Sequence, residues 1–159
     1  MAAPTLTVAT LQLGDIMTTE DMTNAVWNRI LHDLFPAPRY LISPEYSFTT
    51  RGGKSGRADL AVLFAGTRKV LVVYEGKKSG GGINTLVDAL GQATTCLSAK
   101  SATMGVAIAA LGDQFSMTDK DLNDVGKFEK DKGGQLWIQE NLDEIADYLA
   151  KTAAAGRRP

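Results

Sequence analysis

The chain of 159 residues has one cysteine, Cys96, and one histidine, His32. A single cysteine cannot form an intramolecular disulfide, and so few thiols favour an intracellular protein. Zinc sites of the Cys/His type need about four such ligands, so this class of metal site is excluded. His32 falls late in a predicted helix, where we interpret it as a structural residue.

Long apolar runs and an excess of basic residues are also missing. No stretch reaches the roughly 18 apolar residues that a transmembrane helix requires. The N-terminal residues lack the basic start and apolar core of a signal peptide, so we expect no membrane partner. The formal net charge is −1, so a nucleic acid would have to be held by a local basic patch or through a metal ion.

The length predicts one domain with a core of its own, because most domains contain about 100–200 residues. We expect a lead-in over residues 1–17 with a short strand at 6–11. The single domain should span 18–152, and residues 153–159 should form a flexible tail. The sequence contains no internal repeat that would suggest a larger array.

What the sequence does contain is a hairpin pattern between Gly56 and Lys78. Two apolar runs, over residues 58–64 and 70–74, have the length and the β-branched composition of strands. Residues with turn chemistry separate them. We therefore predict two neighbouring antiparallel strands that are buried along most of their length.

The register of this hairpin brings two acidic residues together. A three-residue loop at 66–68 would pair Phe64 with Val70 and place Asp59 directly opposite Glu75. Directly opposed residues have Cβ atoms about 5 Å apart, and like charges at that distance are destabilising. If the register is right, another group must offset the repulsion between the two carboxylates.

A lysine joins the two carboxylates at the end of the hairpin. Side chains alternate along a strand, so Lys77 shares a face with Glu75 and Gly76 points the other way. A divalent cation between Asp59 and Glu75 would explain the cluster, because hard oxygen ligands suit Mg²⁺. The alternative is a surface ion pair between Glu75 and Lys77, since a Glu-x-Lys pattern often occurs by chance.

Two glycine-rich loops flank the hairpin. The loop over 51–57 carries Arg51, Lys54 and Arg57, which can contact phosphates, although a solvated connection explains it equally well. It does not match the Walker A pattern. The loop over 79–82 can offer backbone N–H groups to a phosphate, and a plain flexible connection is the alternative.

The remaining chain alternates helices and strands. The expected elements are a helix over 18–35 capped by Thr18 or Thr19, a strand over 40–50 with Ile42, Tyr46 and Phe48 on one face, the hairpin, a helix over 84–100, a strand over 103–111, a short helix over 119–125, a strand over 135–139 and a final helix over 141–151 capped by Asn141. Three consecutive strands imply an antiparallel meander, and the helical crossover that follows makes the sheet mixed. We therefore predict an α/β fold with helices flanking a mixed sheet.

With these elements in place, the chain resembles the PD-(D/E)xK nuclease superfamily, which has the restriction-endonuclease-like fold. The resemblance covers about residues 18–111, in the order αβββαβ. It rests on Asp59 in the second strand, on Glu75-Gly76-Lys77 at the end of the third, and on a later helix that carries Gln92. Ala58 stands where the family motif often has proline.

The resemblance implies a role for each of these residues. The ligands of Mg²⁺, with Mn²⁺ as a substitute, would be Asp59, Glu75, the backbone carbonyl of Gly76, and Glu20 near the start of the first helix. The catalytic set would be Asp59, Glu75, Lys77 and Gln92. Lys77 would position or activate the attacking water. The contacts to nucleic acid would come from Arg51, Lys54, Arg57 and Lys78.

The function that the resemblance implies is metal-dependent endonucleolytic hydrolysis of nucleic acid, with DNA as the expected partner. The alternatives are a non-catalytic binding module on the same fold, and an unrelated α/β domain in which the motif is a surface ion pair. A homodimer is compatible with the sequence. Neither the substrate structure nor its sequence specificity follows from these residues.

Overall fold

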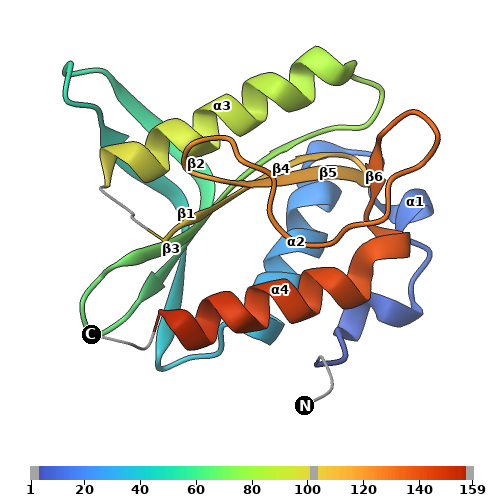
Figure 1. Ribbon diagram of the computed structural model, residues 1–159, viewed down its shortest axis with the longest axis horizontal. Helices are drawn as coiled ribbons and strands as arrows, with labels where there is room; N and C mark the ends of the chain where they lie inside the picture. The colour runs from blue at the N-terminus through green and yellow to red at the C-terminus, as the bar shows by residue number, and fades with distance from the viewer. Residues whose placement is uncertain (1–3, 101–103, 157–159) are drawn as a thin grey trace.

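A computed structural model describes residues 4–100 and 104–156 of the chain (Figure 1). A six-stranded sheet in the order β1-β2-β3-β4-β5-β6 runs through the molecule. The elements are η1 (Thr7–Thr10), α1 (Leu13–Ile16), α2 (Glu20–Leu34), β1 (Tyr40–Thr49), β2 (Ser55–Phe64), β3 (Val70–Lys77), α3 (Ile83–Ala99), β4 (Val106–Leu111), β5 (Gln114–Asp119), β6 (Leu136–Trp137), η2 (Gln139–Asn141) and α4 (Leu142–Ala155).

The sheet is mixed, and helices cover both of its faces, so the predicted α/β class is confirmed. Strand β3 runs antiparallel to β2 and parallel to β4, and the crossover between β3 and β4 is α3. Helix α3 lies across one face, while α2 and α4 lie on the other (Figure 1). No helix in the described part of the chain is long and apolar enough to span a membrane.

The first long helix forms within the predicted range and begins at one of the two predicted caps. Thr19 caps α2, because its hydroxyl oxygen accepts a hydrogen bond of 3.2 Å from the backbone N–H of Met22. Glu20 and Asp21 lie in the first turn, where negative charge complements the helix dipole. Trp27, which is fully buried, anchors the helix on the sheet.

The hairpin of β2 and β3 reaches the predicted register by a different route. Four residues, 65–68, form the loop, and Leu63 rather than Phe64 lies opposite Val70. A loop of that length alone would turn Asp59 and Glu75 to opposite faces. A bulge beside Leu63 shifts the register back by one residue.

The consequence of the bulge is visible further along the ladder. Val62 pairs with Val72 and Leu60 with Tyr74. The next position in this register sets Asp59 against Glu75, as the sequence predicted. Turn chemistry alone did not reveal that two irregularities, the longer loop and the bulge, compensate each other.

Strand β1 changes the face that it buries at Glu45. Ile42 packs on the larger core beside α2 and α4, whereas Tyr46 and Phe48 pack on the smaller core beside α3. The prediction that these three side chains share one face is therefore wrong. Glu45 has a left-handed φ of 49°, which is uncommon outside glycine and breaks the alternation of the strand.

The N-terminal segment is helical instead of extended. The strand expected over residues 6–11 is wrong, since residues 7–10 form η1 and α1 follows. Leu6, Val8 and Leu13 are buried against the larger core. The short apolar spacing favours a strand, but packing against α2 decides the conformation.

Strand β5 was not predicted from the sequence, and the helix expected over 119–125 is wrong. A two-residue turn at Gly112 and Asp113 returns the chain from β4 into β5, where Phe115 and Met117 are buried. The sequence pattern that could have predicted β5 is a pair of turn residues, Gly112 and Asp113, followed by alternating apolar residues. Gly112 has a φ of 56°, a value that suits glycine in such a turn.

Asn141, the predicted cap of the last helix, bonds to the preceding loop instead. The Asn141 side chain makes no cap bond with α4, which runs on to Ala155, past the predicted end at 151. Instead its oxygen accepts a bond of 2.7 Å from the Glu129 N–H, and its amide nitrogen donates to the carbonyls of Glu129 and Trp137 at 3.0 and 2.9 Å. Asn141 is buried and thereby fastens the 120–135 loop to the domain.

Replacing this asparagine should destabilise the fold. Asn141→Ala leaves the Glu129 N–H and two carbonyls without their partner, so we expect a loss of about 1–3 kcal/mol in unfolding free energy. Urea denaturation measures this, with the exposed neighbour substitution Glu140→Ala as the control. Equal stability of the two variants would show that the loop is held by other contacts.

Candidate active site

Strands β2 and β3 separate at the end of their ladder. Their pairing stops at Leu60 and Tyr74, although β2 remains paired with β1 as far as Ser55 and β3 with β4 as far as Lys77. The two strands thus form a fork in the middle of the sheet. Backbone groups on the inner sides of the fork lose their usual partners there.

Asp59 and Glu75 lie in this fork and take up the unpaired N–H groups. The Gly76 N–H donates to Asp59 Oδ2 at 2.8 Å, and the Asp59 N–H donates to Glu75 Oε1 at 3.2 Å. Each carboxylate thus bonds to the opposite strand. The structure brings the two predicted carboxylates together, and these bonds use only one oxygen of each.

The surroundings of Glu75 in the fork favour its neutral form. This side chain is only 3% exposed. Burial, and next the negative charge of Asp59, raise the pKa of Glu75 to about 7, while the positive charge of Lys77 acts in the opposite direction. A carboxyl group poised between its charged and neutral forms at neutral pH is typical of functional sites.

The donor set of the fork fits a divalent cation of the Mg²⁺ type. Mg²⁺ prefers oxygen ligands and commonly uses one or two carboxylates, with water completing its shell. Asp59 and Glu75 each retain an oxygen that the two backbone bonds do not use. A bound cation would also favour the charged form of Glu75 and so replace its proton.

Gly76 is tightly enclosed on the side facing α2. A Cβ atom at this position would overlap Asn24 Oδ1 and the Tyr74 hydroxyl. The Tyr74 hydroxyl donates to Asn24 Oδ1 at 2.8 Å, and the Tyr74 ring packs against Trp27 with centroids 5.8 Å apart. Glycine therefore permits α2 to approach the end of β3.

Asn24 is a site-forming residue that sequence reasoning missed. It lies four residues after Glu20 in α2, so the two side chains share one side of the helix. Its bond to Tyr74 fixes the helix beside the strand that carries Glu75. The sequence pattern that could have identified Asn24 is its spacing of four residues from Glu20, which places both on one polar side of the helix.

Glu20 lies near the fork without joining the carboxylate pair. It is the first residue of α2 and is exposed, and its charge contributes to the raised pKa of Glu75. Within residues 4–100 and 104–156, no three His, Cys, Asp or Glu side chains are close enough to hold a metal ion together. The proposed role of Glu20 as a ligand remains a prediction.

Gln92, the residue of α3 that the resemblance assigns to the catalytic set, lines a cleft. It is exposed on α3 and lines a cleft with Arg57, whereas neither Asp59 nor Glu75 lines that cleft. Lys77 is half-buried at the end of β3, and its charge acts on Glu75. Lys77 thus acts electrostatically on Glu75, Gln92 lines the neighbouring cleft, and the catalytic roles of both remain predictions.

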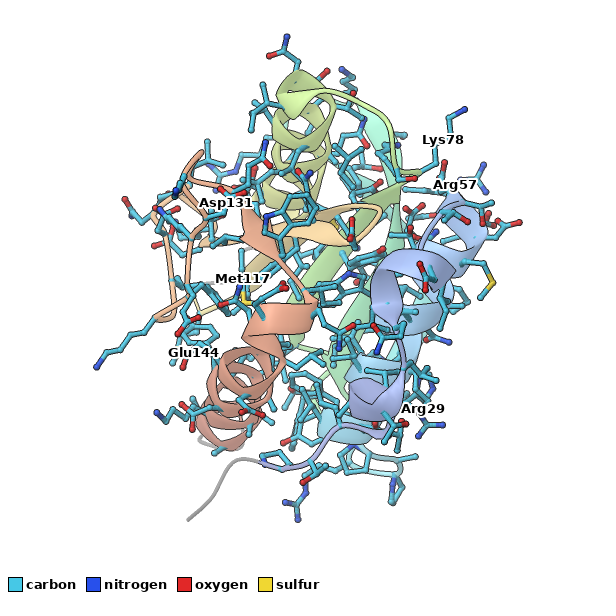
Figure 2. The ribbon with its side chains drawn as sticks, turned by 90° about the vertical axis from the view of Figure 1, so that its right-hand side faces the viewer. Arg29, Arg57, Lys78, Met117, Asp131 and Glu144 are labelled. Atoms are coloured by element: carbon cyan, nitrogen blue, oxygen red, sulfur yellow. The ribbon has the colours of Figure 1, made fainter. Side chains whose placement is uncertain are left out.

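The predicted phosphate-binding residues lie on exposed segments. Arg51, Lys54 and Arg57 belong to the projecting end of the β1–β2 hairpin, where Arg57 makes an exposed ion pair of 3.6 Å with Glu45. Lys78 directly follows β3 and is also exposed. In Figure 2 Arg57 and Lys78 lie at the same edge of the view, opposite Glu144 on α4.

Comparisons with known proteins bear on the fold. No protein-family model matches the chain, and no curated protein matches it significantly. Among solved structures, it is similar to a chain in the cryo-EM structure of the DrdV–DNA complex, with a TM-score of 0.61 and 12% identity. The match covers 96% of this chain and only 14% of that chain, so it concerns the fold alone.

The raised pKa of Glu75 predicts how stability depends on pH. The folded state binds a proton more tightly than an unfolded glutamate, whose ordinary value is 4.5, so the contribution of Glu75 to stability should fall as pH rises from about 4.5 to about 7. In EDTA, the melting temperature of Glu75→Gln relative to that of wild type should therefore increase as pH rises. The matched control is the exposed Glu140→Gln. A difference between Glu75→Gln and wild type that is constant across pH would contradict the raised pKa.

The enclosure of Gly76 predicts an intolerant position. Gly76→Ala forces Asn24 and Tyr74 to move, and overpacking of this kind costs about 1–3 kcal/mol or more in unfolding free energy. Asn24→Ala in the same chain should recover part of that loss, which a double-mutant cycle measures. Gly82→Ala is the control, because a Cβ there meets no neighbouring atom within 4 Å. Additive effects of the two substitutions would refute the enclosure.

Proposed function

We propose that this chain is a metal-dependent phosphodiesterase that acts on DNA, with Asp59 and Glu75 as ligands of Mg²⁺ or Mn²⁺. The observation that carries the proposal is the carboxylate pair in the fork, where burial and like charge hold a proton that a cation can replace. The similarity in fold to a chain of a DNA complex supports DNA as the substrate.

The residues of the fork supply distinct parts of this chemistry. A bound Mg²⁺ would lower the pKa of its water and neutralise charge on the scissile phosphate. The Gly76 N–H fixes the orientation of Asp59, and the Asp59 N–H fixes that of Glu75. Lys77 adds a positive charge and a hydrogen-bond donor beside them, which suits the orientation of an attacking water.

The outer residues have supporting roles in the proposal. Glu20, which acts on the Glu75 charge from the start of α2, can complete the metal shell through water. The backbone carbonyl of Gly76 is the further ligand that the family pattern suggests. Arg51, Lys54, Arg57 and Lys78 would hold phosphates away from the scissile bond through charge.

A second candidate is a non-catalytic nucleic-acid-binding module. It is favoured by the lack of a third acidic or histidine ligand close to the carboxylate pair within the described residues. The two functions differ in their response to metal. A catalytic site should raise the melting temperature in millimolar Mg²⁺ or Mn²⁺ through binding to the native state, whereas a module without a metal site should not.

Lys77 gives the sharpest test of catalysis. An ammonium has no lone pair for a metal, so Lys77→Ala should keep Mn²⁺ affinity while DNA nicking falls by about a hundredfold or more. Stability should change by about 1 kcal/mol or less, since the side chain ends a strand. Nicking of supercoiled DNA, calorimetry with Mn²⁺ and melting measure the three quantities.

Lys78 is the matched control, because it is the adjacent exposed lysine. Lys78→Ala should lower activity only slightly, while Asp59→Ala and Glu75→Ala should lose both activity and Mn²⁺ affinity. Linear DNA, single-stranded DNA and RNA tested beside supercoiled DNA would define the substrate. Cleavage by Lys77→Ala at the wild-type rate would remove Lys77 from the proposed mechanism.

A further inference from the structure

A cleft of about 820 Å³ has Lys54 and Arg57 in its lining, and the proposed function assigns no role to its other residues. One wall is the arm, which we define as residues 45–57 of the β1–β2 hairpin, beyond the point where β2 leaves β3. The other wall is α3, which the arm approaches at the left of Figure 1. The lining includes Phe48, Lys54 and Arg57 from the arm, and Asp88, Gly91 and Gln92 from α3.

An aromatic ring forms part of the cleft surface. Phe48 lies opposite Gly56 in the ladder, and a Cβ added to Gly56 would come within 2.7 Å of the tip of the ring. The ring therefore extends across the neighbouring strand. Phe48 is only half-buried, so part of its surface remains open to the cleft.

Gly91 keeps the opposite wall open. It lies in the interior of α3, where glycine is less favourable than alanine. A Cβ atom on Gly91 would meet no neighbour within 4 Å, so close packing does not require glycine here. Gly91 lines the same cleft as Phe48, and the absence of a side chain at Gly91 leaves the cleft wider there.

The lining of the cleft includes two basic side chains, one acidic side chain and one amide. Lys54 and Arg57 stand on the arm side, and Asp88 and Gln92 stand on the α3 side. Lys54 makes no ion pair with any of the residues that the structure describes. An aromatic surface, basic groups and polar side chains together match a nucleotide, through base stacking, phosphate contacts and recognition of base edges.

We propose that this cleft binds one unpaired nucleotide of the DNA strand on which the carboxylate site acts. The inference rests on the proposed function and specifies its substrate class. Arg57 precedes Asp59 by two residues on β2, a separation of about 7 Å, so the cleft begins next to the site. A base within a duplex is stacked and paired, so only an unpaired base offers its face to Phe48 and its edge to Gln92.

The test measures binding in EDTA, where cleavage plays no part, by fluorescence anisotropy at fixed salt. The probes are a blunt DNA duplex and the same duplex with a short single-stranded extension. Wild type should bind the extended probe about tenfold more tightly, as expected for one stacked base. Phe48→Leu keeps the apolar packing but removes the stacking face, and Gly91→Leu fills the cleft, so both should lose this preference.

Asn84→Leu is the matched control, because it adds the same side chain at an exposed position of α3 that does not line the cleft. It should keep the preference. The melting temperature of Gly91→Leu, measured beside that of Gly91→Ala, should stay close to that of wild type, which separates cleft filling from unfolding. Equal binding of the two probes by wild type, or an undiminished preference in Phe48→Leu, would overturn the proposal.

Parallel cleavage assays in Mn²⁺ separate this proposal from the catalytic one. If wild type prefers the extended probe but does not cleave it, nucleotide binding by the cleft is supported and the proposed phosphodiesterase activity is refuted. If wild type cleaves DNA but binds both probes equally, nucleotide binding by the cleft is refuted and the proposed phosphodiesterase activity is retained.

Discussion

The reciprocal bonding of Asp59 and Glu75 across the strand fork is the interaction on which the rest of the site depends. The two side chains accept the N–H groups that β2 and β3 leave unpaired where they part. This satisfies the backbone inside the sheet, where an unpaired donor would be costly. It also holds the half-buried Asp59 beside the buried Glu75, which disfavours the ionised form of Glu75.

The elements around the fork can be understood as support for this arrangement. Tyr74, Asn24 and Gly76 fix α2 against the end of β3, so that the charge at the start of α2 acts on the same carboxyl group. The left-handed Glu45 turns the β1–β2 arm from one core to the other. That turn places the arm beside α3 and creates the cleft next to the carboxylates.

Much of this fold was predictable because the strongest patterns are local. The Thr19 cap, the apolar stripe of α2, the hairpin and the fully buried β4 all follow from residues close in sequence. The bulge beside Leu63, the turn at Glu45 and the side-chain role of Asn141 depend on packing between distant segments, which a single sequence does not display. Asp59 and Glu75 were found through register and through a family resemblance, while Asn24 required the packed structure.

We expect a divalent cation bound by Asp59 and Glu75 to replace the proton of Glu75. Calorimetric titration with Mg²⁺, repeated in buffers of different ionisation enthalpy, counts the protons released on binding. With a Glu75 pKa of about 7, binding of one ion per chain should release about one proton at pH 6 and almost none at pH 8.5. Absence of binding heat, or identical proton release by Glu75→Gln, would contradict the claim.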